Sequence, residues 1–222
     1  MVSLLGVVFR FRQRLYALAG DIRQMFLQLE MRPVDRQSQL FLYSGESGDP
    51  EIYMLDVATF GATCSPCSAQ YTKNVNALEH AAEFPVAAEA IVENTYVDDF
   101  LDSRDTVDEL LSLAVQVRTI NGNAGFEIRN WQSNAVEVLE QLGDSSTEST
   151  KSFTAEKSTA AERVLGITWN PTEDVLSFSV VLREDLNPLL SGEIVPTKRQ
   201  VLRVLMSFFD PLGLITFYTV HG

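Results

Sequence analysis

The sequence predicts an α+β fold, in which an antiparallel sheet is backed by helices. Residues 15–21, 91–102 and 126–134 are short segments rich in apolar, β-branched and aromatic side chains, as strands are. Residues 68–84 and 106–120 instead carry apolar side chains at helical spacing. The chain has 222 residues, of which 45% are hydrophobic and only 8 are proline, so a substantial core is expected.

The first predicted strand, residues 15–21, follows a basic patch of Arg10, Arg12 and Arg14 and ends on Asp21. An acid at the end of a strand is a common helix N-cap, so one interpretation is that Asp21 caps a helix over 22–29. The alternative is that Asp21 belongs to a site. Phe26 is either an ordinary core residue or a member of the same site.

A polar, glycine-rich segment at 44–50 separates the apolar runs 40–43 and 52–57, which predicts a hairpin. Residues 59–66 then lead into the predicted helix 68–84, which Pro85 closes. Gly61 permits close approach of the backbone to a ligand, and Pro66 suits the first turn of a helix.

Two adjacent acids, Asp98 and Asp99, lie at the tip of the hairpin predicted over 91–102. Like charges a few ångströms apart repel unless a cation lies between them, and Mg²⁺ is the natural oxygen-seeking cation. An ordinary polar turn is the alternative interpretation of an isolated pair of acids.

The predicted helix 106–120 has an acidic first turn, and the strand 126–134 follows it. We divide the chain into a main domain over 1–142, a mobile connection over 143–160 rich in Ser, Thr, Glu and Lys, and a last region over 161–222. The last region contains a hairpin from 163–171 and 175–180 and a helix that Thr197 caps.

Composition restricts the function. The net charge is −13, with 30 acidic against 17 basic residues, which is unusual for a protein that grips nucleic acid by itself. We find no transmembrane run, and residues 1–9 lack the basic leader of a signal peptide, so an intracellular location, cytoplasmic or nuclear, and no membrane partner are expected. Cys64 and Cys67 form a C-x-x-C pair, for which redox chemistry is a minor alternative and zinc, with only His80 and His221 as further ligands, a weaker one.

The motifs together resemble those of reverse transcriptases. Tyr96-Val97-Asp98-Asp99 is similar to their acidic hairpin, and Asp21 followed five residues later by Phe26 is similar to their first motif. Phe60-Gly61 and Ser65-Pro66 resemble the second motif, and the run over 125–134 the fourth. Phe60 in place of the Gln of many retroviral relatives makes the chain similar to the BEL/Pao group, as a truncated part of an LTR retrotransposon polyprotein.

The resemblance implies a polymerase palm with partial fingers over 1–142 and a primer-grip-like hairpin with the start of a thumb or connection over 161–222. It implies RNA-directed DNA polymerase activity, in which two metal ions transfer dNTPs onto a primer 3′-hydroxyl. Mg²⁺ is the expected cofactor, with Mn²⁺ as a substitute, and the expected partners are an RNA or DNA template with its primer, dNTPs and the remainder of the polyprotein.

Residue by residue, the resemblance makes Asp21, Asp98 and Asp99 catalytic metal ligands and assigns the backbone carbonyl of Ile22 to the metal. It assigns nucleotide contacts to Phe26, Phe60, Gly61, Ser65, Pro66 and Tyr96. Relatives often carry Lys where this chain has Asn130, and Arg129 is the candidate general acid in its place. The alternative function is a catalytically inactive palm remnant, either inert or retained as an interaction module.

Overall fold

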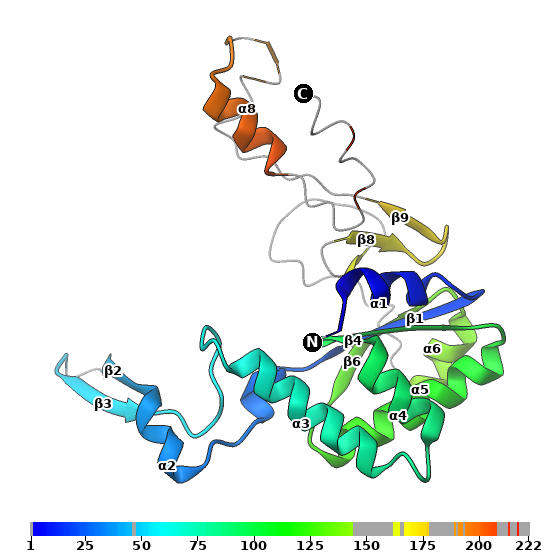
Figure 1. The fold of residues 1–222 in the computed structure, drawn as a ribbon, viewed down its shortest axis with the longest axis horizontal. Coiled ribbons are helices and arrows are strands. Elements are labelled where there is room, and N and C mark those ends of the chain that lie inside the picture. The colour runs from blue at the N-terminus through cyan, green and yellow to red at the C-terminus, as the bar shows by residue number, and fades with distance from the viewer. Residues whose placement is uncertain are drawn as a thin grey trace. The chain divides into compact units, whose positions relative to one another are not determined.

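The computed structural model describes residues 2–45, 48–143, 162–164, 167–177, 189, 191–192, 194–207, 213 and 217 (Figure 1). The chain forms two compact units, Met1–Thr147 and Glu148–Gly222. The predicted connection over 143–160 lies outside the described residues apart from Gly143. No helix among the described residues is both long and apolar enough to cross a membrane.

The first unit is organised around a four-stranded antiparallel sheet with the strand order β4-β5-β1-β6. Its strands are β1 (Tyr16–Ile22), β4 (Thr95–Tyr96), β5 (Asp99–Arg104) and β6 (Ile128–Ser133). Helices α4 (Pro85–Asn94), α5 (Val107–Asn123) and α6 (Val136–Leu142) pack on one face of this sheet, and α3 (Ser65–Glu79) packs against α4 and α5. The predicted α+β class, an antiparallel sheet backed by helices, is confirmed.

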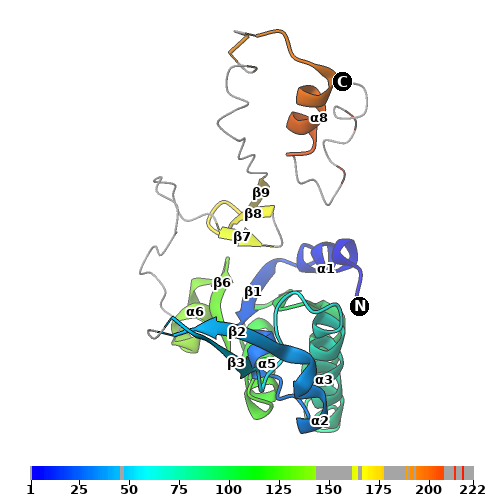
Figure 2. The ribbon, with the colours of Figure 1, turned by 90° about the vertical axis from the view of Figure 1, so that its left-hand side faces the viewer.

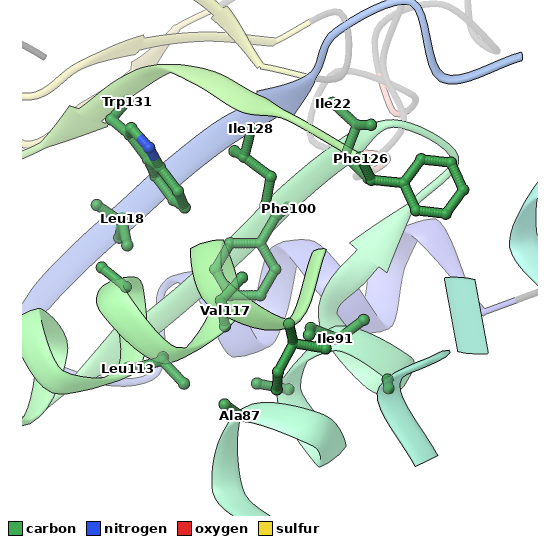
Figure 3. Packing of buried hydrophobic residues seen from close by; sticks show 14 of the residues in the cluster. Leu18, Ile22, Ala87, Ile91, Phe100, Leu113, Val117, Phe126, Ile128 and Trp131 are labelled. Carbon is green, nitrogen blue, oxygen red and sulfur yellow. The ribbon is translucent and has the colours of Figure 1, made fainter. Parts of the chain in front are cut away.

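Alternation along β1 decides which side chains meet the helices. Leu18 and Ile22 are buried in the main core cluster, and they pack with side chains from β5, β6 and the helices (Figure 3). Those labelled in Figure 3 include Phe100, Leu113, Val117, Ile128 and Trp131. Since successive strand residues point to opposite faces, Asp21 points away from this core.

A close approach of β6 to β1 explains why Gly20 precedes the acid. A Cβ atom at Gly20 would lie 2.7 Å from the Trp131 ring and 2.8 Å from Ile128. The register between β1 and β6 shifts between Ala19 and Asp21, and Asn130 has φ of 54° at this irregularity. Asn tolerates this left-handed conformation better than most residues.

Helix α1 (Leu4–Phe11) begins at Ser3, whose side chain caps it, and buries Val7, Val8 and Phe11. Ser103, on the same face of β5 as Asp99, donates its hydroxyl to the Arg10 carbonyl at 2.6 Å. Helix α1 therefore contacts the sheet on the face that the other helices leave free. The sequence interpretation saw only a short apolar run at 1–9.

The stretch before the acids differs from the prediction. Residues 91–94 are not strand but the last turn of α4, and only Thr95–Tyr96 form β4.

The predicted role of Pro85 is also wrong. Pro85 does not close a long helix over 68–84: α3 ends at Glu79, and Pro85 opens α4. Proline is suited to the first turn because its missing N–H has no helical acceptor there. The apolar run 87–91 is a buried helix face, which a short window cannot distinguish from a strand.

The remaining predicted elements of this unit lie close to their expected positions. Thr106 caps α5 with a full capping box involving Glu109. Strands β2 (Leu40–Ser44) and β3 (Pro50–Met54) form a separate antiparallel hairpin whose residues are all exposed. The chain between β1 and β2 contains η1 (Met25–Gln28), α2 (Pro33–Arg36) and η2 (Gln37–Gln39).

In the second unit, β7 (Glu162–Val164), β8 (Ile167–Asn170) and β9 (Val175–Ser177) form one antiparallel sheet (Figure 2). Strands β8 and β9 form the predicted hairpin, and β7 adds a third strand. Helix α8 (Lys198–Leu205) begins with a capping box between Thr197 and Gln200. The ends of the predicted segments, at 178–180 and 208–212, lie outside the described residues.

Candidate active site

The β1–β5 register places Asp21 directly opposite Asp99. Residues paired in this way on antiparallel strands point to the same face, here the face away from the main core. On the other side of Asp21, β6 places Arg129 opposite it. Asp21 therefore lies between a carboxylate and a guanidinium on neighbouring strands.

Asp98 lies in the turn between β4 and β5. Val97 has φ of 56°, an uncommon conformation for a β-branched residue, and it reverses the chain within this short turn. The Ile22 N–H donates to the Asp98 carbonyl at 2.9 Å, which joins the turn to the end of β1. Tyr96 pairs with Asp99 in the β4–β5 register.

The N-cap interpretation of Asp21 is wrong. Asp21 lies inside β1, which continues to Ile22, and only the short 3₁₀ helix η1 follows, beginning after Gln24. Residues 22–29 do not form a helix that Asp21 could cap.

The three carboxyl groups interact electrostatically. Burial raises the pKa of Asp99 to about 7, and repulsion by Asp98 and Asp21 contributes. Burial also raises the pKa of Asp21, with repulsion by Asp98 adding to it and the Arg129 cation opposing it. Burial raises the pKa of Asp98, which hydrogen bonding to the backbone partly offsets. A cation between these groups would relieve the repulsion.

This donor set suits an ion that needs few protein ligands. Among the described residues, no group of three or more His, Cys, Asp or Glu side chains forms a ready-made metal cage. Mg²⁺ commonly takes one or two carboxylates and completes its shell with water and substrate phosphates. The paired Asp21 and Asp99, with Asp98 beside them, fit that mode of binding.

Arg129 is half-exposed, and its Nε lies 3.8 Å from Oδ2 of Asp21. Its place beside the acid follows from the β1–β6 register rather than from any nearby sequence signal. The guanidinium is positioned to contact an anion that approaches Asp21.

A second group of predicted site residues comes together before α3. The rings of Phe26 and Phe60 meet edge to face with centroids 4.9 Å apart. Phe26 is buried, whereas Phe60 is 63% exposed. Gly61 has φ of 88°, which favours glycine at this turn.

Ser65 and Pro66 form the first turn of α3. The Ser65 hydroxyl donates to the Thr59 carbonyl at 2.7 Å, and its N–H donates to the Ala62 carbonyl at 3.1 Å. These two bonds close the turn that contains Gly61.

Cys64 and Cys67 are free and exposed, and they flank this turn. His80 donates through Nδ1 to the Asn76 carbonyl, and its Nε2 accepts from Nδ2 of Asn123, so its ring serves the helix packing. His221 lies outside the described residues. No zinc site forms from the described cysteines and histidine.

Sequence reasoning missed two buried polar groups near the acidic hairpin. Lys73 is fully buried in α3, at the spacing of a core residue between Ala69 and Ala77. Asp102 is 2% exposed on β5, where it accepts from Asn94 at 2.8 Å and pairs with Arg104 at 3.0 Å. The sequence offered one signal for them: both charged residues are spaced along the chain as core residues are. Charged residues at core positions are rare, so these two could have been noticed.

The strand order, the main helices on one face and the acids on the other define a reverse-transcriptase-like palm fold. A solved structure described as the foamy viral protease-reverse transcriptase in complex with RNA/DNA hybrid is similar, with a TM-score of 0.54 and 16% sequence identity over 99% of this chain. The chain spans 25% of the length of that protein. No family model and no curated protein matches the sequence.

Proposed function

We propose that the chain is a part of an RNA-directed DNA polymerase from a BEL/Pao-type LTR retrotransposon polyprotein. It would transfer dNTPs onto a primer 3′-hydroxyl by the two-metal reaction. The observation that carries this proposal is the pairing of Asp21 with Asp99, with Asp98 in the adjoining turn, on the face of a palm-like sheet that lies away from the main core.

Asp21, Asp98 and Asp99 would hold Mg²⁺ or Mn²⁺, with the Ile22 carbonyl as a further oxygen ligand. The ions, when bound, supply positive charge to the primer oxygen and to the triphosphate. The strands hold the carboxylates in place before any ion arrives, since backbone pairing fixes Asp21 against Asp99. Because the pKa of Asp99 is raised to about 7, ion binding should strengthen as the pH rises through neutral.

The turn before α3 would form the floor of the nucleotide site. Phe26 would pack under the sugar and leave no room for a 2′-hydroxyl, and Phe60 supports its ring. Gly61, Ser65 and Pro66 shape the adjoining backbone, and Tyr96 lies next to the acids. Arg129 would donate a proton to, or neutralise, the departing pyrophosphate.

The proposed partners are an RNA or DNA template with its primer. The solved neighbour is described in complex with an RNA/DNA hybrid, which supports this choice. The net charge of −13 implies that most cationic contacts to the duplex come from the remainder of the polyprotein.

The same charge favours a second candidate, a palm remnant without catalytic activity that is inert or serves as an interaction module. Such a remnant should bind primed duplex weakly, with little dependence on salt. The polymerase should bind it with an affinity that falls steeply as salt rises.

The test is extension of a DNA primer on an RNA template with Mg²⁺ or Mn²⁺. Asp98→Asn removes a charge from the metal site and should abolish extension almost completely. Asp108→Asn, an exposed acid in the first turn of α5, is the control and should retain activity. Extension that persists in Asp98→Asn would reject the assignment, and a wild-type chain that is inactive with both metals would favour the remnant.

A further inference from the structure

The buried face of α3 contains no large apolar side chain. Its buried residues are Ser65, Ala69, Gln70, Lys73 and Ala77. The facing helix α4 contributes mainly small residues, among them Ala87, Ala88 and Ala90. Packing of large side chains into grooves therefore does little to set how α3 lies along its neighbours.

Lys73 is the largest side chain on this face and is 0% exposed. Its Nζ donates to the Ile91 carbonyl at 2.7 Å. Ile91 lies in the last turn of α4, where carbonyls lack N–H donors within the helix. The Thr95 hydroxyl donates to the same carbonyl at 2.8 Å, at the first residue of β4.

A second polar bond from α3 follows the same pattern. Asn76 donates through Nδ2 to the Ile120 carbonyl at 2.8 Å, and Ile120 lies in the last turn of α5. Side chains of α3 thus satisfy the open carbonyl ends of two neighbouring helices. Directed hydrogen bonds of this kind specify one relative position, which contacts between alanines do not.

Keeping an amine at this position is costly. Within the described residues no carboxylate pairs with Lys73, and burial lowers its pKa to about 7. The neighbouring Gln70 amide is also buried, and neither of its polar atoms has a hydrogen-bond partner there. An apolar side chain of similar length would bury the same volume without the desolvation cost, so the bond to Ile91 is the benefit that the amine provides.

We propose that Lys73 is a positioning residue that fixes the acidic hairpin relative to the turn at Gly61–Pro66. Helix α3 starts inside that turn, and α4 ends directly before β4 and the two acids. The Lys73–Ile91 bond joins these two helices where the chain enters the hairpin. The consequence for nucleotide transfer rests on the proposed function, whereas the mechanical role of Lys73 does not.

Hydrogen exchange on the full chain, followed by mass spectrometry, tests this role whether or not the chain extends a primer. Lys73→Met keeps the length and removes the donor. We expect backbone amides at 95–99 to exchange about tenfold faster in this variant, the effect of one lost hydrogen bond, with an unchanged or higher unfolding temperature. Lys73→Gln, which retains an N–H donor, should exchange at an intermediate rate.

Two further variants complete the test. Thr95→Val removes the other donor to Ile91 and should accelerate exchange at the same amides. Thr119→Val removes a comparable bond, from the Thr119 hydroxyl to the Val115 carbonyl on the exposed side of α5, and should leave residues 95–99 unchanged. Unchanged exchange at 95–99 in Lys73→Met would overturn the proposal, as would equal acceleration throughout 107–117. Where Lys73→Met does not fold, the same criteria apply to Lys73→Gln and Thr95→Val.

In an active chain, Lys73→Met should raise the KM for dNTP more than it lowers kcat. The reason is that the turn at Gly61–Pro66 and the acids would no longer be held at a fixed distance from each other. Exchange that changes without any wild-type extension would retain the role of Lys73 and reject only the polymerase.

Discussion

Asp21 and Asp99 lie directly opposite each other on β1 and β5, on the face of the sheet that the main helices leave free. Pairing of like charges at this position destabilises a sheet when both are ionised. Burial, together with repulsion by Asp98 and Asp21, raises the pKa of Asp99 to about 7.

The first prediction concerns this pair. The folded chain holds the Asp99 proton more tightly than the unfolded chain, so stability should fall as the pH rises from about 4 to about 7. Asp99→Asn removes the titration. Relative to this variant, the metal-free wild type should lose roughly 2–4 kcal/mol of unfolding free energy over that interval, measured by urea denaturation.

The control for this experiment is Glu89→Gln on the exposed side of α4, which should follow the wild type. Millimolar Mg²⁺ should remove most of the difference at pH 8, because the ion offsets the repulsion. A wild-type curve parallel to that of Asp99→Asn would show that folding does not raise the pKa of Asp99.

The second prediction concerns Gly20. Alanine at this position would bring a methyl group within 2.7 Å of the Trp131 ring, which is itself buried. The ring or the strand must move, and we expect a loss of about 1–3 kcal/mol of unfolding free energy. Gly122→Ala in α5 is the matched control, since nothing lies within 4 Å of its new methyl group.

Gly122→Ala should stabilise the chain by about 0.5–1 kcal/mol, because alanine is the better helix former. Equal effects of the two alanines in chemical denaturation would mean that β6 does not approach β1 as closely as the structure shows.

The third prediction concerns Lys73. Because its folded pKa is lowered from 10.5 to about 7, the unfolded chain binds the proton more tightly between these values. Stability should therefore rise with pH from about 7 to about 10, by roughly 2–4 kcal/mol relative to Lys73→Met. Exposed Lys198→Met serves as the control, and it should keep the wild-type dependence in thermal unfolding measured across this range. If the unfolding free energy of Lys73→Met rises with pH as steeply as that of the wild type, the Lys73 amine is exposed to water.

The sequence was informative where a local pattern matched its structural cause. The acidic first turn of α5 and the two hairpins with glycine or polar turns were recognisable, because the residues that form each pattern are close together in the chain. Asp98 could be placed in a turn for the same reason, and Asp99 directly after it begins β5.

What could not be predicted depends on partners distant in sequence. The helical state of residues 91–94 follows from burial of Ala87, Ala90 and Ile91 against the core, not from local preference. The position of Arg129 beside Asp21 depends on the register between β1 and β6, in which a single-residue shift would move the side chain to the other face. The role of Lys73 could not be predicted either, because its amine bonds to the Ile91 carbonyl at the end of another helix, α4.

The last prediction uses this cross-strand position of Arg129. Burial raises the pKa of Asp21, and the Arg129 cation opposes this rise and repels an incoming metal ion, so Arg129→Gln should tighten Mn²⁺ binding by about two- to fivefold. As both side chains are partly exposed, the unfolding free energy should change by less than about 0.5 kcal/mol.

Electron paramagnetic resonance of free and bound Mn²⁺ measures the affinity. Arg14→Gln, which breaks the exposed pair with Asp105 at 2.8 Å, should leave the affinity unchanged. If Arg129 also serves the departing pyrophosphate, the variant should bind Mn²⁺ more tightly and extend a primer more slowly, and weaker Mn²⁺ binding would contradict the placement of the cation.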